Sequence, residues 1–377
     1  MQKDELLSKT ISFLRFPLIV GVVFIHFNII EMGLSAHGIS YGADYPGWFY
    51  HVVRFFSVVL PAMCVPLFFF FSGYLFFYHT DFNANIYWEK LRKRCHTLLI
   101  PFVLWNIIGA LMILMYKIPF LQTVLPDGAN VKIDLSFERV LNIFFNKDNC
   151  ILVQSAVPRN TPYPIDAPLW FVRELFVVVI LSPAIFYLIN KLRGWFILLL
   201  GLIWSVLLPI VFPHGSYFVL FGKAVFFFAW GAFYSVKKMN FVVEMQKLRL
   251  APYAFPPLAI ADTLTKGMVI NTYLHSAVIM VGLLSVIIIA ANLIETDKVK
   301  VNQLFAKPVF FIFALHGLII QNIGKMVISL IHLPDNVYVI TAFYFSIPII
   351  TIAICTFVYI LISRYLPPIY RLLTGNR

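Results

Sequence analysis

The sequence predicts an all-α integral membrane protein with about ten transmembrane helices. Of its 377 residues, 61% are hydrophobic and 12% are charged, whereas a soluble domain has about 25% charged residues. Apolar runs of about 20 residues recur along the chain, which is the length that a helix needs to cross a bilayer. The 39 Phe and 18 Tyr residues suit lipid-facing surfaces and interfacial belts.

We expect the spans in this order: 11–31, 52–78, 98–117, 168–190, 195–213, 217–236, 249–264, 272–293, 308–331 and 338–363. The seventh is short and contains Pro252, Pro256 and Pro257, which disfavour a helix interior. If it crosses the membrane, most of the 29 basic residues fall on the same side as the N-terminus. Cytoplasmic loops of membrane proteins carry such an excess of Lys and Arg. Both termini are therefore predicted to be cytoplasmic, and the net charge of +12 follows from this topology.

The whole chain, 1–377, is predicted to form a single transmembrane domain with one long extracytoplasmic loop at about 118–167. Long loops at a membrane surface are often functional, and a simple packed cap is the alternative. The first apolar run has no signal-peptide cleavage site after it, so we interpret it as a membrane helix. Four cysteines lack metal-ligand or CxxC spacing and are interpreted as packing residues, with no metal site predicted: Cys64, Cys95, Cys150 and Cys355.

The first predicted helix, LRFPLIVGVVFIHFNI over 14–29, carries Arg15 and His26 in an otherwise apolar stretch. Eleven residues are about three helical turns, so both would lie on one face, about 16 Å apart. Ionisable residues inside a span are costly and are functional candidates by default. A histidine with a pKa near neutrality is the usual general base, and Glu174, predicted at a similar depth, can orient it as the acid does in a triad.

The other ionisable residues divide into two predicted layers. The outer layer contains Arg54, Arg173, Glu174, Lys223, Asp262 and Lys325, and the inner layer contains Arg15, Ser72, Lys90, Arg92, Lys93, Arg94 and His316. The inner cations suit a polyanionic cytosolic ligand such as coenzyme A. Simpler alternatives remain open: Arg54 and Lys223 can extend to the interface, His316 can be an interior histidine, and the basic cluster at 90–94 can be only a topology signal.

Five segments, taken together, resemble the acyltransferase-3 family of membrane proteins. They are the Arg15–His26 pair on the first helix, FFFFSGYLF at 68–76, KLRKRCHTLLIPF at 90–102, APLWFVRELF at 167–176 and FFIFALHGLII at 310–320. They occur in the family order and are spread over most of the chain. One departure is that Thr97 stands where some members carry a second arginine, three residues after Arg94.

The resemblance implies O-acyl transfer, usually of acetyl, from cytosolic acetyl-CoA to a hydroxyl of a cell-envelope glycan or its lipid-linked precursor. On this reading, the coenzyme phosphates bind Arg15, Lys90, Arg92, Lys93 and Arg94, and Ser72 and His316 line the donor path. His26 is the general base, with Arg15 and Glu174 as further catalytic residues. The acceptor site would contain Trp170, Arg173 and Glu174, with Arg173 a candidate for stabilising the oxyanion.

Two other classes of function fit intramembrane charges. A glycan or lipid transporter of similar architecture would use them as a substrate path or proton relay, and dependence on acyl-CoA discriminates between the two. A non-catalytic sensor or assembly subunit would tolerate an apolar residue in place of His26. The expected partners are acetyl-CoA, the sugar acceptor and membrane lipid, with no nucleic acid, and the expected location is the bacterial cytoplasmic membrane. The oligomeric state is left open.

Overall fold

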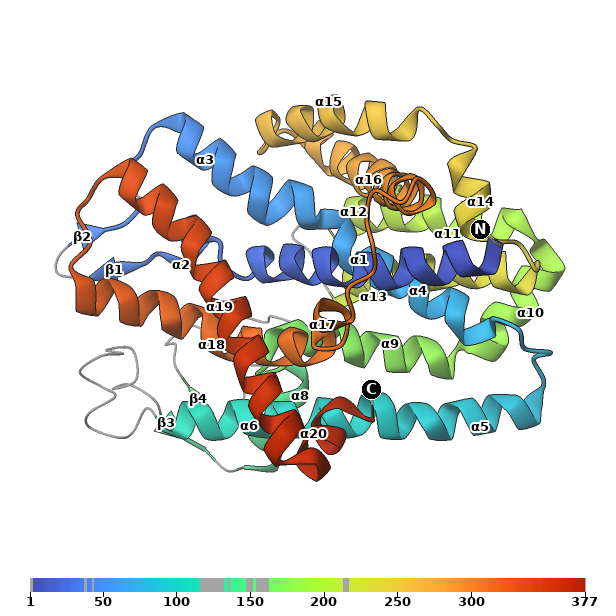
Figure 1. Cartoon of the computed structure of the whole chain (residues 1–377), viewed down its shortest axis with the longest axis horizontal. Helices are drawn as coiled ribbons and strands as arrows, with labels where there is room; N and C mark the ends of the chain where they lie inside the picture. The colour runs from blue at the N-terminus through green and yellow to red at the C-terminus, as the bar shows by residue number, and fades with distance from the viewer. Residues whose placement is uncertain are drawn as a thin grey trace. The chain divides into compact units, whose positions relative to one another are not determined.

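The computed structural model describes residues 3–36, 39–42, 44–115, 132–134, 136–146, 152–153, 163–212 and 217–376. In this part of the chain nearly all regular structure is helical (Figure 1). The exceptions are two antiparallel pairs of two-residue strands: β1 (Ser35–Ala36) with β2 (Ile39–Ser40), and β3 (Lys132–Ile133) with β4 (Leu152–Val153). The predicted all-α class is confirmed. Most of the predicted loop at 118–167, and Cys150 within it, lies outside the described residues.

Eight helical segments of the described chain are long and apolar enough to cross a membrane, so the protein is a multi-pass membrane protein. They are Asp4–Met32, Gly47–Phe77, Ala84–Met115, Gly194–Val211, Tyr217–Val236, Val269–Glu295, Val309–Ile331 and Val337–Tyr365. The predicted seventh span is a 14-residue helix, α15 (Ala251–Leu264). At 1.5 Å per residue it is about 21 Å long, which is shorter than the hydrocarbon layer. Of the ten predicted spans, eight, or nine with the bent pair described next, therefore meet the length and hydropathy of a membrane-crossing helix in the described residues.

The predicted span 168–190 is two helices, Ala167–Ile180 and Ser182–Leu192, joined at an angle of 62°. The second of these, α10 (Ser182–Leu192), has Pro183 within its first two residues. Proline lacks the N–H that would continue the preceding helix, and its ring displaces the carbonyl one turn earlier. The bend is therefore encoded by this proline.

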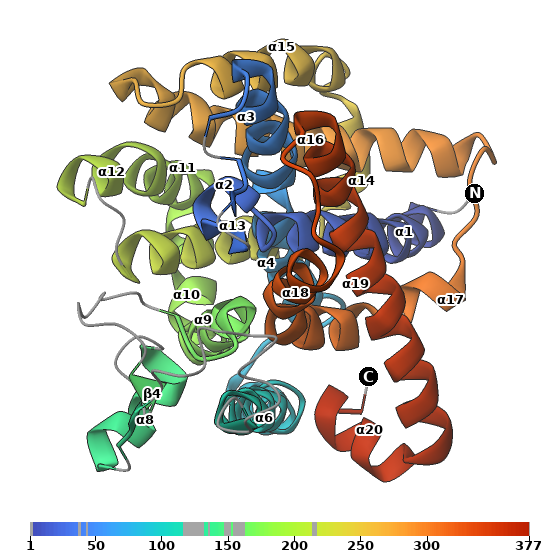
Figure 2. The same ribbon diagram turned by 90° about the vertical axis from the view of Figure 1, so that its left-hand side faces the viewer.

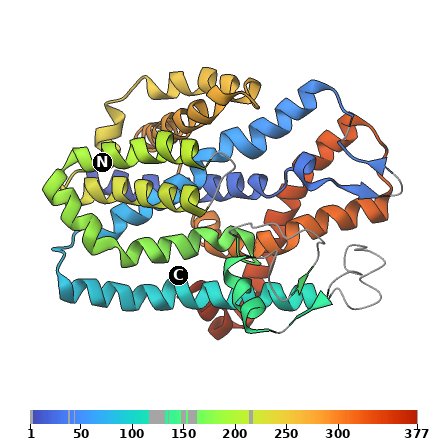
Figure 3. The same cartoon turned by 180° about the vertical axis from the view of Figure 1, so that it is seen from behind.

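Two compact units make up the fold. Unit 1 comprises residues 1–22, 54–94 and 174–309, and unit 2 comprises residues 23–53, 95–173 and 310–377. The helices of unit 1 that position the features described below are α1 (Lys3–Ile25, up to Val22), α4 (Cys64–Phe77), α5 (Ala84–Arg94), α10, α11 (Gly194–Leu202), α13 (Tyr217–Val236), α14 (Phe241–Gln246), α15 and α16 (Val269–Glu295). Helices α15 and α16 lie side by side (Figure 2), and so do α11 and α13, the lime and yellow ribbons of Figure 3.

Helices α4 and α13 pack with their backbones in direct contact. A Cβ atom at Gly73 would overlap the carbonyl of Phe228, and a Cβ atom at Gly231 would overlap the carbonyl of Phe70. Membrane helices gain little from apolar burial against each other, so association depends on such close approach between small residues. Aromatic rings surround the contact, and the ring centroids of Phe70 and Trp230 are 5.2 Å apart. These two glycines therefore set the distance between the central helices of unit 1.

Unit 2 is built around the C-terminal part of the chain. Its main helices are α2 (Ile29–Met32), α3 (Gly47–Arg54, up to Val53), α6 (Ile100–Met115), α8 (Phe137–Phe145), α9 (Trp170–Ile180, up to Arg173), α18 (Val309–Ile331, from Phe310), α19 (Val337–Tyr365) and α20 (Pro367–Thr374). Helix α19 begins at Asn336, whose side chain accepts the N–H groups of Tyr338 and Val339, an N-cap of the usual kind. Trp105 of α6 donates to the Leu373 carbonyl at 3.0 Å and so fixes the terminal helix.

We expect the Gly73→Ala protein to lose about 1–3 kcal/mol of stability, because the added methyl forces α4 and α13 apart. Gly231→Ala acts on the same contact, so the effects of the two substitutions should not be additive. Unfolding of each purified variant in lipid nanodiscs measures this. Gly194→Ala is the matched control, because nothing lies within 4 Å of a Cβ atom at that position. An unchanged midpoint for Gly73→Ala would contradict the close contact.

Candidate functional site

Two histidines predicted from the sequence meet in unit 2. The ring centroids of His26 and His316 are 5.2 Å apart with an interplanar angle of 63°. Helix α1 ends at Ile25, and the N–H of His26 bonds to the Val23 carbonyl at 3.2 Å. His26 therefore lies in the turn directly after the helix. The structure brings a residue near the N-terminus and one from α18 into edge-to-face contact.

The hydrogen bonding of His316 fixes its tautomer. Its side chain is fully buried, and Nδ1 lies 2.9 Å from the Ile312 carbonyl one turn earlier. A carbonyl oxygen can only accept, so Nδ1 carries the hydrogen, and Nε2 of the neutral ring has the lone pair. This Nε2 is buried and has no hydrogen-bond partner among the described residues. His316 therefore holds an unused proton acceptor inside the fold.

Further buried polar atoms accompany the histidine pair. Oδ1 of Asn28, two residues after His26, has no hydrogen-bond partner in the described chain, and neither has either carboxyl oxygen of Asp166. A Cβ atom at Gly317, next to His316, would come within 2.7 Å of Asp166 Oδ1. Buried polar groups are nearly always paired, so such a concentration marks a place where a ligand or a proton completes the bonding.

Asp166 was not singled out from the sequence. Its N–H donates to Asn106 Oδ1 at 3.1 Å, and the Asn106 amide donates in turn to the Phe102 carbonyl at 2.7 Å. Complete burial raises the pKa of the Asp166 carboxyl well above its usual range, because desolvation disfavours the charged form. The available signal was an acid placed directly before the APLWF segment, where no basic partner is near in sequence.

The remaining predicted site residues are divided between the two units. Unit 1 contains Arg15, Ser72, Lys90, Arg92, Lys93, Arg94 and Glu174, and unit 2 contains Trp170 and Arg173 with the histidine pair. Arg15, Arg92 and Lys93 are exposed, whereas Glu174 is fully buried. Lys90 donates to the Phe76 carbonyl and, at 2.9 Å, to Thr80 Oγ1. Its ammonium thus holds the chain that follows α4.

Arg173 is bound to the described part of the predicted outer loop. Its guanidinium donates to the Phe144 carbonyl at 3.3 Å and lies 5.9 Å from the Phe145 ring centroid. Both partners belong to α8. Trp170, three residues earlier, is half-buried at the start of α9. In this arrangement Arg173 attaches α8 to α9.

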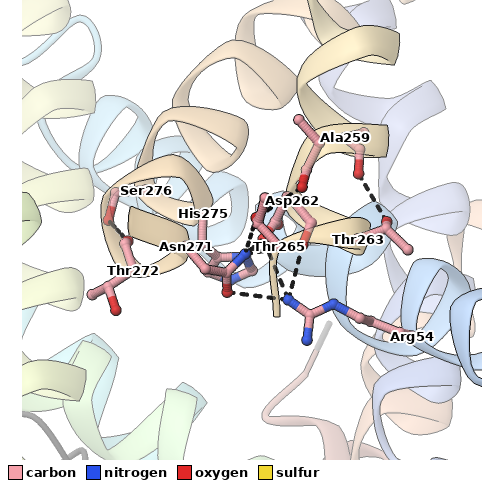
Figure 4. A network of polar contacts seen from close by, with 10 residues as sticks. Arg54, Ala259, Asp262, Thr263, Thr265, Asn271, Thr272, His275 and Ser276 are labelled. Atoms are coloured by element: carbon pink, nitrogen blue, oxygen red, sulfur yellow. Dashed lines mark hydrogen bonds and ion pairs between the residues drawn. The ribbon is translucent and has the colours of Figure 1, made fainter. Parts of the chain in front are cut away.

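A polar network in unit 1, not predicted from the sequence, joins Arg54 to the α15–α16 hairpin (Figure 4). Asp262 is fully buried; its Oδ2 lies 2.7 Å from His275 Nδ1, and its Oδ1 accepts from the Asn271 amide at 2.6 Å. Arg54 Nη2 donates to the Asp262 carbonyl at 3.0 Å and lies 3.6 Å from Oδ1. The alternative that Arg54 merely extends to the interface is wrong, because its guanidinium is buried and bonded within the protein.

The described residues contain no group of three or more His, Cys, Asp or Glu side chains that could hold a metal ion. Cys64, Cys95 and Cys355 are free thiols. Imidazoles take up and release protons near neutral pH, and the histidine pair lies in an apolar setting, with the Phe313 ring centroid 6.1 Å from that of His316.

Comparison with known proteins identifies the class. Residues 9–363 match the acyltransferase domain family, and the chain belongs to that family. It is therefore a membrane acyltransferase, which decides between the enzyme and the transporter or sensor alternatives. The succinoglycan biosynthesis protein ExoH of Rhizobium meliloti (strain 1021) is 26% identical over 390 residues, covering 99% of this chain and 94% of the relative. No solved structure matches the chain.

The Asp262→Ala protein should lose about 3–5 kcal/mol, since removing the carboxylate leaves a buried arginine uncompensated. His275→Ala should cost less, about 1.5–3 kcal/mol, for one charge-assisted hydrogen bond. Denaturant unfolding of the two single variants and the double variant measures the coupling between them. Ser276→Ala is the control, because its hydroxyl bonds only within its own helix, to the Thr272 carbonyl at 3.3 Å. Equal losses of stability in all three single variants would contradict the network.

The raised pKa of Asp166 predicts a pH dependence of stability. A carboxyl whose pKa is raised on folding binds more protons in the native state, so stability falls as pH rises above the ordinary value of about 3.9, by up to about 1.4 kcal/mol per pH unit. Asp166→Asn should remove this slope. The gain in stability of the variant over the parent should therefore be larger at pH 8 than at pH 4. Thermal unfolding at both values tests it, with the exposed Asp44→Asn as control. Identical slopes for the parent and Asp166→Asn would show that the carboxyl ionises freely.

Proposed function

We propose that this membrane acyltransferase transfers an acetyl group from acetyl-CoA to a hydroxyl of an envelope polysaccharide or its lipid-linked precursor, in the bacterial cytoplasmic membrane. Membership of the acyltransferase family supports the reaction type. The similarity to a protein named for succinoglycan biosynthesis supports a polysaccharide acceptor. The predicted positive-inside topology supports a cytosolic donor.

The observation that carries the proposal is the contact between the His26 and His316 rings. His26 takes the proton of the acceptor hydroxyl as its oxygen forms a bond to the thioester carbonyl carbon. The carbon–sulfur bond then breaks, and the proton passes to the departing thiolate, which gives the ester and free coenzyme A. His316, whose ring centroid lies 5.2 Å from that of His26 and whose Nε2 has a lone pair, stabilises the positive charge that His26 acquires. This contribution resembles that of an acid in a catalytic triad.

Donor and acceptor residues are assigned as the sequence predicted, except for His316, Lys90 and Arg173. The exposed cations Arg15, Arg92 and Lys93, together with Arg94, attract the coenzyme phosphates, and Ser72 lines the donor path. Lys90 acts by holding the chain after α4, as its bonds to Phe76 and Thr80 suggest. Trp170 and Glu174 contribute to the acceptor side. Arg173 shapes that side through α8, and its donation to the Phe144 carbonyl argues against a role at the oxyanion.

The proposal predicts that His26→Ala lowers acetyl transfer by about 10²–10⁴-fold, the usual contribution of a general base. Purified protein in nanodiscs is given acetyl-CoA labelled on the acetyl group together with crude envelope polysaccharide, and both thiol release and label transfer are followed. His316→Ala should also lower the rate, but less, because His26 remains. The exposed His51→Ala serves as the matched histidine control.

A folded His26→Ala protein with full transfer would overturn the assignment of the base. A parent protein that consumes another acyl-CoA but not acetyl-CoA would overturn the acetyl donor while leaving the reaction class intact. Unfolding midpoints, measured for every variant, separate loss of chemistry from loss of structure.

A further inference from the structure

A cavity of about 820 Å³ lies in unit 1 where four segments of the chain come together. Its walls come from the start of α1, the end of α4 with residues 78–83, α10, and the end of α13 with residues 238–240. Sites for small molecules and cofactors span about 300–1,000 Å³, so the volume is that of a ligand site. All four segments are ones that the charge distribution assigns to the cytosolic side of the membrane.

Aromatic rings form much of the cavity wall. The Tyr74 and Tyr78 ring centroids are 5.2 Å apart, and the Tyr78 and His79 centroids are 4.0 Å apart. Phe186 stacks on Phe77 at 5.9 Å with an interplanar angle of 19°. All five residues line the cavity. Flat π-surfaces of this kind bind nucleobases by stacking.

The cavity is also lined by polar side chains that can form hydrogen bonds to a ligand. Ser235 is 9% exposed, and its Oγ is buried with no hydrogen-bond partner among the described residues. Asp4 accepts from the Tyr78 hydroxyl, and burial together with this carboxylate raises the pKa of Tyr78. The Asp81 side chain is exposed. Carboxylates and a hydroxyl match the amino group of a base and the hydroxyls of a ribose.

A histidine and a lysine of the cavity wall occupy positions where the backbone favours glycine. His79 has φ of 49° and Lys238 has φ of 54°. The turn after α13 is closed by the Met239 N–H, which bonds to the Tyr234 carbonyl at 2.8 Å, and glycine or asparagine usually follows a helix ended in this way. A non-glycine residue in this conformation is strained, and such residues cluster at ligand sites.

Lys90 links the basic cluster to this cavity. Its ammonium bonds to the Phe76 carbonyl and to Thr80 Oγ1, and Thr80 lines the cavity. The segment carrying Tyr78 and His79 is thereby held against the end of α4. The predicted donor-binding cluster therefore contributes to the cavity by fixing one of its walls.

We propose that this cavity binds the adenosine 3′-phosphate end of the acyl-CoA donor, with the base stacked on Tyr78 and His79, the ribose near Asp81 and Ser235, and the phosphate on Lys238. The assignment of the ligand as the donor rests on the proposed function. The chemistry that selects a nucleotide is the combination of stacking rings, acceptors for hydroxyl and amino groups, and a cation.

The test is to measure by calorimetry how adenosine 3′,5′-bisphosphate binds to the full chain in nanodiscs. This probe has no thioester and no pantetheine arm. Lys238→Gly should weaken binding at least about tenfold, the effect of one lost charged contact. Glycine relieves the strained φ, so this variant should fold at least as well as the parent. Ser235→Leu, which fills the cavity, should also weaken binding.

Lys237→Ala is the matched control. Its ammonium lies 3.3 Å from Asn190 Oδ1, and it does not line the cavity, so binding should be unchanged. In turnover, Lys238→Gly should raise KM for acetyl-CoA about tenfold and leave kcat unaltered, because the residue contacts the donor far from the reacting carbonyl.

Binding that is absent in the parent, or equal in the parent, Lys238→Gly and Ser235→Leu, would overturn the cavity as the nucleotide site, even if acetyl transfer is normal. Conversely, binding that depends on these residues, without any acyl transfer from the thioester, would leave the nucleotide site standing and overturn the proposed function. A shift in KM for Lys237→Ala as large as that for Lys238→Gly would also contradict the proposal, since it would reflect general surface charge.

Discussion

The contact on which the structure of unit 1 depends is the backbone approach of α4 and α13 at Gly73 and Gly231. In a membrane there is no gain from removing apolar side chains from water, so two helices associate through close packing and the bonds that it permits. Because neither glycine has a Cβ, each lies against a carbonyl of the other helix. The large rings of Phe70 and Trp230 then pack around a narrow axis. The position of the cavity at the ends of these helices depends on this contact, since two of its lining residues are close to the glycines: Tyr74 directly follows Gly73, and Ser235 lies about one turn after Gly231.

The buried polar groups of the two units differ in how completely they are hydrogen-bonded. In unit 1 the buried Asp262 is bonded to Asn271 and His275 and lies close to the Arg54 guanidinium, so the cost of desolvating its charge is offset. In unit 2, Asp166 and His316 retain buried atoms with no partner among the described residues. The first arrangement stabilises a hairpin. The second leaves buried hydrogen-bonding groups unpaired among the described residues, a feature that is uncommon in a purely structural cluster.

The sequence predicted the membrane class and most of the spans, and it singled out His26 and His316 as candidates, because these inferences depend on local composition and on the cost of a polar group in lipid. It did not predict that the two rings meet, because about 290 residues separate them in the chain. The Asp262–His275 pair was missed for a related reason. Each residue lies near the end of an apolar segment, where a polar side chain is ordinarily unremarkable, and only the folding of α15 onto α16 makes them partners.

The motif around Ser72 and Gly73 shows the same difference between what the sequence predicts and what the tertiary structure decides. The sequence placed the pair on the second predicted span, but the close contact of Gly73 with the Phe228 backbone follows from the tertiary structure. By itself the sequence determined which segments prefer lipid and where charge concentrates, but it predicted one span over 168–190 and missed the bend before Pro183. Only the tertiary structure decided which helix ends converge, that α15 folds onto α16, and that Lys90 bonds within the protein. The physical reason is that hydropathy and proline geometry act over one helix, whereas partners of buried polar groups are chosen between helices distant in the chain.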